Sequence, residues 1–250
     1  MSLLETISKP KQTAIIATIT GDAGIGKTSL AATFPKPIFI RAEDGMQSLS
    51  GENMPDAFPT LQKVDELWEQ LGALINEKHE YKTVVIDSVT KLERMFIEYV
   101  VEKDPKKPRS INSALGGYGA GLAAVAGMHQ RVRKAAELLK QKGINTVFIA
   151  HADTETIDLP DEEPYTRYNL RLGKKSTAPY VDDSDLVGFL KLETFITGEE
   201  GEKKRAISDG TRVLVVQATA ANVSKNRFGI EEPITVNKGE NPLKTYIKGL

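Results

Sequence analysis

Residues 21–28 read GDAGIGKT, which fits the phosphate-loop pattern G-x-x-x-x-G-K-S/T. Glycines allow the backbone to wrap closely around phosphate groups with its N–H groups pointing inward. The helix expected after the loop adds the positive end of its dipole. We expect Lys27 to reach the β- and γ-phosphates and the Thr28 hydroxyl to bind Mg²⁺. The residues expected to contact the nucleotide are Gly21, Asp22, Ala23, Gly24, Ile25, Gly26, Lys27, Thr28 and Ser29. This stretch therefore predicts a site for a nucleoside triphosphate.

The surroundings of the loop predict an α/β fold. An apolar run over 13–20 precedes the loop, and a helical pattern, SLAATF, follows it. Three further short runs rich in Ile and Val alternate with amphipathic helical patterns, which is typical of βαβ units on a mainly parallel sheet. The runs cover 37–40, 83–87 and 146–150, and the helical patterns cover 64–75, 92–100 and about 120–142.

The last third of the chain follows a different pattern. Residues 185–196, 205–208 and 212–218 are predicted strands, joined by the turn-rich segments GEEG at 198–201 and DG at 209–210. We interpret them as an antiparallel extension of the sheet and not as a separate domain. The prediction is a single domain with a core over about 12–198 and a C-terminal β extension over about 199–250.

Composition excludes several classes of protein. With 40% apolar and 27% charged residues, the 250-residue chain resembles ordinary soluble globular proteins. It has no cysteine, which excludes a disulfide scaffold, a thiolate metal site and a cysteine nucleophile. No stretch approaches 18 consecutive apolar residues, so we expect no membrane contact and a cytoplasmic location. The three histidines, His79, His129 and His151, lack the spacing of metal ligands.

A second magnesium ligand is expected at the end of the apolar run TVVID. Asp87 closes this run, at the carboxyl end of a predicted strand, where ligands bind in open α/β sheets. We therefore predict that Thr28 and Asp87 bind Mg²⁺ together. Asp87 or Ser88 could also cap the helix that follows, and the two interpretations are compatible.

Three strand ends resemble those of RecA-type ATPases. IFIRAEDG at 38–45 is similar to the second core strand, whose glutamate polarises the attacking water, and this implies that Glu43 is the general base, with Asp44 as the alternative. VVIDSVTKL at 84–92 resembles the Asp-Ser form of the third core strand. VFIAHAD at 147–153 lies in the place of the fourth, whose polar tip senses the γ-phosphate, which implies this role for His151. RecA itself has an Asn-Gln pair there, and a core or capping histidine is the alternative.

The sequence KNRFG at 225–229 resembles the motif of the RadA branch of the same family. The resemblance implies that Lys225 and Arg227 reach the ATP of a neighbouring subunit. It further implies a core strand order of 5-1-4-3-2 and assembly into a ring or filament with ATP at the subunit interface. On a chain of this length, the whole set, over about 12–236, looks most like the minimal RecA-core proteins of bacteriophages, which act as single-strand annealing recombinases.

Two long linkers are candidates for DNA binding, because the resemblance implies mobile DNA-binding loops at these places. They cover 103–121 and 152–183. Basic side chains for phosphates together with an aromatic ring for base stacking favour single-strand binding. An ordinary solvated loop remains the alternative for each linker. The candidate DNA-binding residues are Lys103, Lys106, Lys107, Arg109 and Tyr118 in the first linker, and Arg167, Tyr168, Arg171, Lys174 and Lys175 in the second.

These observations predict a Mg²⁺-dependent, DNA-stimulated ATPase that binds single-stranded DNA and promotes annealing or recombination. The expected ligands are ATP and Mg²⁺, and the expected partners are single-stranded DNA, further copies of the chain and a single-strand DNA-binding protein. If the chain is phage-encoded, it acts in the cytoplasm of a bacterial host. The alternatives are an ATP-gated adaptor or assembly factor without DNA-stimulated hydrolysis, and a small-molecule P-loop kinase.

Overall fold

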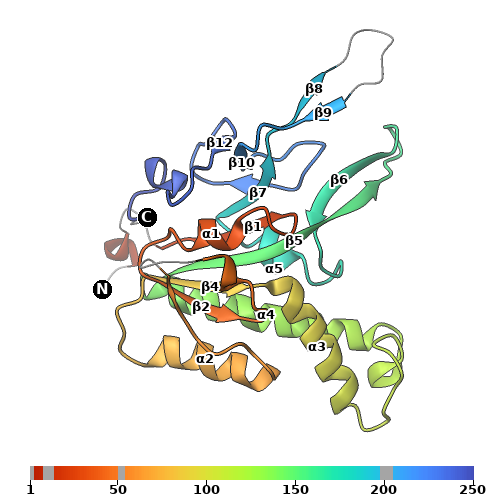
Figure 1. Ribbon diagram of the computed structural model, residues 1–250. Helices are drawn as coiled ribbons and strands as arrows, with labels where there is room; N and C mark the ends of the chain where they lie inside the picture. The colour runs from red at the N-terminus through yellow and green to blue at the C-terminus, as the bar shows by residue number, and fades with distance from the viewer. Residues whose placement is uncertain (1–2, 8–13, 50–53, 198–204) are drawn as a thin grey trace.

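The computed structural model describes residues 3–7, 14–49, 54–197 and 205–250 (Figure 1). The α-helices are α1 (Lys27–Ala31), α2 (Val64–Asn76), α3 (Val89–Lys103), α4 (Ala120–Gln141) and α5 (Ala178–Val181). The strands are β1 (Ile16–Gly21), β2 (Pro37–Arg41), β3 (Asp56–Ala57), β4 (Thr83–Asp87), β5 (Asn145–Ile157), β6 (Tyr165–Leu170), β7 (Leu186–Leu192), β8 (Phe195–Thr197), β9 (Arg205–Ile207), β10 (Arg212–Val215), β11 (Lys225–Asn226) and β12 (Ile234–Thr235). Short 3₁₀ helices cover Leu3–Thr6, Met46–Ser48, Ala114–Gly116 and Pro242–Thr245. In these described parts of the chain, no helix has the length and apolar character needed to span a membrane.

The centre of the sheet is parallel. β7, β1, β5, β4 and β2 lie side by side in this order and run in the same direction. Counted as core strands along the chain, this is the order 5-1-4-3-2 implied by the resemblance to RecA-type ATPases, so the expected fold class is confirmed. Because the strands are parallel, their carboxyl ends meet at one edge, and the phosphate loop lies there.

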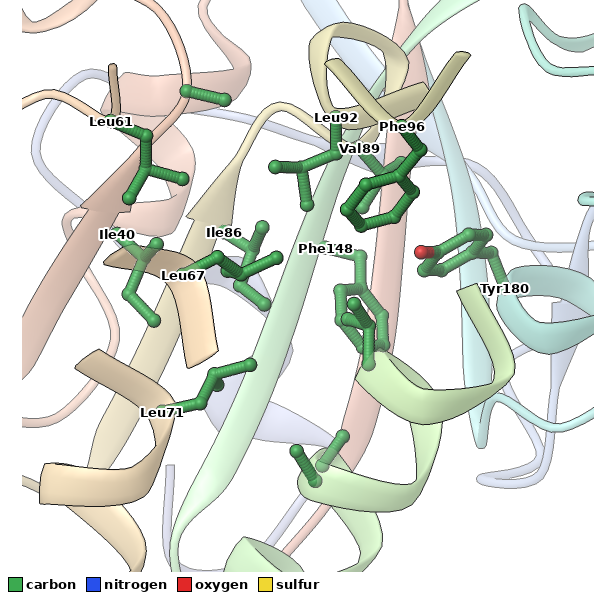
Figure 2. Close-up of a cluster of buried hydrophobic side chains, with 14 of the residues drawn as sticks. Ile40, Leu61, Leu67, Leu71, Ile86, Val89, Leu92, Phe96, Phe148 and Tyr180 are labelled. Carbon is green, nitrogen blue, oxygen red and sulfur yellow. The ribbon is translucent and has the colours of Figure 1, made fainter. Parts of the chain in front are cut away.

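One face of the sheet is covered by α2, α3 and α4, which lie together below it in Figure 1. Figure 2 shows part of the buried cluster at this face, with Leu67 of α2 and Phe96 of α3 near Ile86 and Phe148 of the strands. The apolar positions along the two helices recur at helical spacing, so each presents one continuous apolar stripe to the strands. The helical patterns predicted over 64–75, 92–100 and 120–142 are confirmed.

The other face is covered by α1 and the C-terminal segment. Val85 and Val147, which alternate with residues of the first cluster along their strands, pack with Leu30 of α1 and with Leu243 and Ile247 near the C-terminus. The C-terminal segment therefore folds back onto the same face of the sheet as α1.

The C-terminal part extends the sheet with antiparallel strands, as expected. β10 and β11 pair antiparallel with β7, and β12 pairs antiparallel with β10. The strand predicted over 185–196 was expected to belong to this antiparallel extension. In the structure, β7 is instead parallel to β1 and is the fifth core strand. Its first five residues are all buried, as a central parallel strand requires, but strand pattern alone does not identify the pairing partner. β8 and β9 form a small separate sheet, and the predicted GEEG turn lies outside the described residues.

The expectation of a long loop over 152–183 is wrong. β5 continues to Ile157, beyond the core, and pairs antiparallel with β6 to form a hairpin that projects from the sheet edge (Figure 1). Both strands of the projecting part are largely exposed. Because these strands are exposed, they carry mostly charged and polar side chains and no continuous apolar run. The sequence pattern is therefore the same as that of a solvated loop.

Candidate nucleotide-binding site

The phosphate loop requires glycine where its backbone meets a neighbouring strand. Gly21, the last residue of β1, pairs with Leu190 of β7, and a Cβ at Gly21 would lie 2.3 Å from the Leu190 carbonyl oxygen. Gly24 and Gly26 have φ angles of 75° and 102°, in the left-handed region that favours glycine. α1 begins at Lys27, directly after this turn. Strand, loop and helix therefore follow one another as the motif predicts.

The Lys27 ammonium group lies inside the loop. Its Nζ donates to the carbonyl oxygens of Gly21 (2.9 Å) and Asp22 (2.7 Å), and the residue is 6% exposed. Burial lowers the pKa of this amine, and the nearby carboxylates of Asp87 and Glu43 oppose the shift. A phosphate oxygen can replace the two neutral acceptors with a charged one, and such hydrogen bonds are stronger. The position of Lys27 thus suits a phosphate ligand.

Thr28 and Asp87 meet as a hydroxyl–carboxylate pair. Thr28 Oγ1 donates to Asp87 Oδ2 at 2.8 Å. Asp87 is 4% exposed, and burial raises the pKa of its carboxyl group. Mg²⁺ beside nucleotide phosphates is held by oxygen ligands of this kind, so the two residues fit the expected magnesium site. Ser88 caps α3, because its hydroxyl accepts a hydrogen bond from Lys91 N at 3.2 Å.

Glu43 and His151 meet at the same edge of the sheet. Glu43 follows β2, His151 lies in β5, and Glu43 Oε1 is 3.2 Å from His151 Nε2. The hydrogen bond from His151 is the main reason that the pKa of Glu43 falls to about 2, while burial opposes the shift and Ser88 adds a second hydrogen bond. The Glu43 carboxylate is therefore ionised at neutral pH.

Asp44, the alternative to Glu43, has other partners. Its carboxylate contacts Arg41 Nη1 at 3.4 Å and accepts a hydrogen bond from Gln47 Nε2 at 2.9 Å. The side chain is 56% exposed, so it is more solvated than Glu43, whose side chain is 36% exposed. Of the two candidates, this geometry favours Glu43 over Asp44 as the general base.

A cavity of about 630 Å³ connects these residues. One wall is formed by the phosphate loop and α1, with Leu30 and Thr33. The segment 236–240 and Arg212, at the start of β10, line the same cavity. This volume suits one nucleotide-sized ligand. Sequence reasoning missed both Arg212 and the segment 236–240. The Asn and Gly of this segment indicate a turn, but the sequence does not show that the turn lies near the phosphate loop.

Comparison with known proteins identifies the family. A family model described as an AAA domain matches residues 13–228. The chain belongs to this family. Together with the strand order and the phosphate loop, the match identifies the fold of the chain as that of a P-loop NTPase of the RecA-like kind.

Two further similarities accompany the family match. The chain is 25% identical over 178 residues to the SPbeta prophage-derived uncharacterized protein YorG of Bacillus subtilis (strain 168). The alignment covers 70% of this chain and 50% of that relative, so the chain matches about half of the relative's length. A crystal structure of the RadB recombinase matches with a TM-score of 0.46 and 15% identity, over 91% of this chain and 90% of that one.

The candidate DNA-binding side chains of the second linker lie on two different faces of the β5–β6 hairpin. Arg167, Arg171 and Lys174 line a groove of about 590 Å³ between the hairpin and α3. Tyr168 lies on the opposite face of the hairpin, where its ring stacks on Phe189 with 4.8 Å between centroids. Within the groove, Arg167 Nε donates to Glu155 Oε1 at 2.7 Å, a cross-strand ion pair. The structure therefore does not bring Tyr168 together with the basic residues.

The first linker meets the second at one point. A Cβ at Gly119 would lie 3.5 Å from Lys175 Nζ, so the two predicted DNA-binding segments are adjacent there. Tyr118 beside it is fully exposed and has a φ of 51°. Lys103 and Lys107 have local partners, namely the Tyr99 ring and the Glu102 carbonyl oxygen. Lys106 and Arg109 lie on the same surface linker.

Lys225 and Arg227 lie far from the phosphate loop of their own chain. Arg227 Nη1 donates to Asp185 Oδ1 at 2.8 Å, and Asp185 Oδ2 accepts from the backbone N–H of Ile16, the first residue of β1. Lys225 Nζ donates to the Asp182 carbonyl oxygen. The phosphate loop follows the last residue of β1, and this six-residue strand spans roughly 17 Å. The structure therefore separates these two residues from the other candidate catalytic residues.

Proposed function

We propose that the chain is a Mg²⁺-dependent ATPase with its nucleotide in the cavity beside Lys27. The observation that carries the proposal is the Thr28–Asp87 contact at 2.8 Å next to the buried Lys27 ammonium group. Lys27 and the loop N–H groups hold the phosphates, and Thr28 and Asp87 hold the metal ion. Bound Mg²⁺ would supply charge neutralisation at the phosphates. Because residues 236–240 of the C-terminal segment line the cavity, we include this segment in the same ATPase domain as the core.

Glu43 is proposed as the residue that orients the attacking water. Its ionised carboxylate can accept a hydrogen bond from water, and phosphoryl transfer depends mainly on positioning and charge stabilisation. His151 holds the Glu43 carboxylate through the 3.2 Å contact and lines the same cavity. We propose that it also senses the γ-phosphate, because it directly follows the continuous buried run of β5, on the ligand side of the sheet.

We propose that single-stranded DNA binds along the groove between α3 and the β5–β6 hairpin and stimulates hydrolysis. Support comes from Arg167, Arg171 and Lys174 in the groove and from Lys175 next to the first linker. Arg171 also connects the two sites, since its backbone N–H donates to the His151 carbonyl oxygen at 2.8 Å. The hairpin tip over 158–163 is exposed and acidic, so we place the DNA at the base of the hairpin.

We further propose that the chain acts as a homo-oligomer in annealing or recombination, in the cytoplasm of a bacterial host of a phage or prophage. The name of the Bacillus relative, which is prophage-derived, supports this source. The resemblance of the KNRFG segment to the RadA branch supports the oligomer. A single-strand DNA-binding protein is a further proposed partner.

The rate of ATP hydrolysis with and without single-stranded DNA tests the proposed function. We expect hydrolysis that requires Mg²⁺ and rises with single-stranded DNA, and we expect Lys27→Ala to lose tight ATP binding while it keeps its fold. Lys134→Ala is the matched control, because this lysine is exposed on α4. Normal ATP binding by Lys27→Ala would contradict the assignment of the phosphate loop. ATP binding without DNA-stimulated hydrolysis would favour the ATP-gated adaptor.

The proposed DNA site is tested by binding across a salt series. Contacts to phosphates make log K fall steeply with log salt, by a slope of about −0.7 per contact on single strands. We expect a Lys174→Ala, Lys175→Ala double variant to bind more weakly with a flatter slope. A Lys78→Ala, Lys82→Ala double variant is the control, because Lys82 lies before β4, at the opposite edge of the sheet. Equal loss in both double variants would contradict a site at the groove.

A further inference from the structure

Arg212 emerges directly beside the phosphate loop. It is the first residue of β10 and pairs with Leu192 of β7, two residues beyond the Leu190 that pairs with Gly21. This register places Arg212 at the carboxyl edge of the sheet, level with the loop. The C-terminal extension therefore brings an arginine to the one place where the core presents its phosphate-binding N–H groups.

The Arg212 side chain runs along the outside of the loop. A Cβ at Gly26 would lie 3.5 Å from Arg212 Nε and 3.9 Å from its Cζ. Gly26 directly precedes Lys27, and Arg212 and Lys27 line the same cavity. Glycine at 26 is therefore needed for its φ of 102° and also leaves the space beside the guanidinium group.

Within the described residues, the Arg212 guanidinium has no carboxylate within ion-pair distance and no hydrogen-bond acceptor. The arginines at 41, 133, 167, 171 and 227 each have an acidic partner. Arg212 is thus a cation beside the phosphate loop whose guanidinium donors have no partner among the described residues. A guanidinium group binds phosphate oxygens in bidentate geometry, which suits a diphosphate or triphosphate chain.

The backbone of Arg212 also contacts a second part of the cavity. Its carbonyl oxygen accepts a hydrogen bond from Val236 N at 2.8 Å, and Val236 begins the segment over 236–240 that lines the same cavity as the phosphate loop. Arg212 therefore contacts two parts of the cavity. Its side chain lies next to the phosphate loop, and its backbone is hydrogen-bonded to the segment 236–240. A ligand phosphate that binds the guanidinium group would hold the two parts together.

We propose that Arg212 is a phosphate-binding residue that acts on the nucleotide of its own chain. The inference rests on the proposed function, since it assumes a nucleotide in this cavity. Its role differs from the one proposed for Arg227, which lies at the other edge of the sheet and serves a neighbouring chain. The C-terminal extension thereby contributes a cation to nucleotide binding in cis.

Nucleotide titrations of charge-changing variants test this inference. Arg212→Met keeps an unbranched stem beside Gly26 but removes the charge, whereas Arg212→Lys keeps the charge. We expect Arg212→Met to weaken ATP and ADP binding by about tenfold or more, the size of a charge-assisted hydrogen bond. Arg212→Lys should lose less affinity than Arg212→Met, because it keeps the charge but not the bidentate geometry. Lys134→Met is the matched control, because Lys134 is exposed on α4 and does not line the cavity beside the phosphate loop.

The outcomes separate this inference from the proposed function. If the parent and Arg212→Met bind ATP equally while Lys27→Ala does not, Arg212 only packs against the loop and the inference is wrong. If the parent does not bind ATP or ADP, the proposed function fails and the inference fails with it. A melting temperature of Arg212→Met without nucleotide that matches the parent excludes general unfolding as the cause of weaker binding.

Discussion

At the residue level, the contact with His151 lowers the pKa of Glu43 and so keeps its carboxylate ionised over a wider pH range. The folded-state pKa of about 2 lies below the ordinary value of 4.5, so the contact stabilises the fold above about pH 4.5. This contribution is lost as the pH falls toward 2 and Glu43 becomes protonated. In the neutral range Glu43 is fully ionised and ready to accept a hydrogen bond from water.

We therefore predict that His151→Ala raises the pKa of Glu43 from about 2 toward 4.5, because the main stabilising hydrogen bond is removed. Carboxyl-detected NMR titration measures this shift directly. His79→Ala is the matched control, since His79 contacts the Leu74 carbonyl oxygen at the end of α2 and not the site. An unchanged Glu43 titration in His151→Ala would mean that other groups hold the carboxylate ionised.

At the level of elements, the parts that the sequence predicted best are local. β4 spans Thr83–Asp87, the predicted limits, because a continuous apolar run ending in Asp leaves little choice of structure. The phosphate loop, with the strand before it and α1 after it, was predictable for the same reason, since one short motif requires all three. Asp87 and Thr28 could be paired in advance, because Asp87 ends β4, Thr28 lies just after the loop that follows β1, and the carboxyl ends of these parallel strands share an edge.

The missed elements depend on contacts distant in the chain. The position of segment 236–240 near the loop follows from the pairing of β10 with β7 and β12 with β10, and periodicity carries no information about pairing partners. The hairpin of β5 and β6 was missed because its exposed residues lack an apolar face. Arg212 was missed because its relation to Gly26 exists only in three dimensions.

The N-terminus of α4 offers a prediction at the same level. A Cβ at Gly121 would lie 2.3 Å from the Ile111 carbonyl oxygen, whereas one at Gly127, exposed on the same helix, would meet nothing within 4 Å. We expect Gly121→Ala to lower the free energy of unfolding by about 1–3 kcal/mol through overpacking. Gly127→Ala should raise it by up to about 1 kcal/mol, because alanine favours helix.

Urea unfolding of both variants measures the difference. Because Gly121 packs against the first linker, Gly121→Ala should also displace that linker and weaken binding to single-stranded DNA, while Gly127→Ala should bind like the parent. Equal stabilities of the two variants would show that the linker moves aside at no cost and is not fixed against α4.

At the level of the whole molecule, the sheet separates two parts of one proposed catalytic apparatus. The phosphate loop, Glu43 and His151 lie at the carboxyl edge, while Arg227 is attached to Asp185 at the opposite edge. Parts at opposite edges can meet only if a second copy stacks head to tail. Such a heterologous interface produces rings or open filaments.

We predict that Lys225 and Arg227 act in trans. Arg227→Ala should bind ATP but hydrolyse it about 10³-fold or more slowly, as for arginine fingers. The variant should fold, because Asp185 keeps its 2.7 Å contact with Lys140 Nζ. Lys27→Ala has the reverse defect, so an equal mixture of the two inactive variants leaves about a quarter of head-to-tail interfaces complete. Roughly that fraction of parental activity should return on mixing. Mixtures that assemble together without any recovery would show that Arg227 does not act across the interface, and its ion pair with Asp185 would then be purely structural.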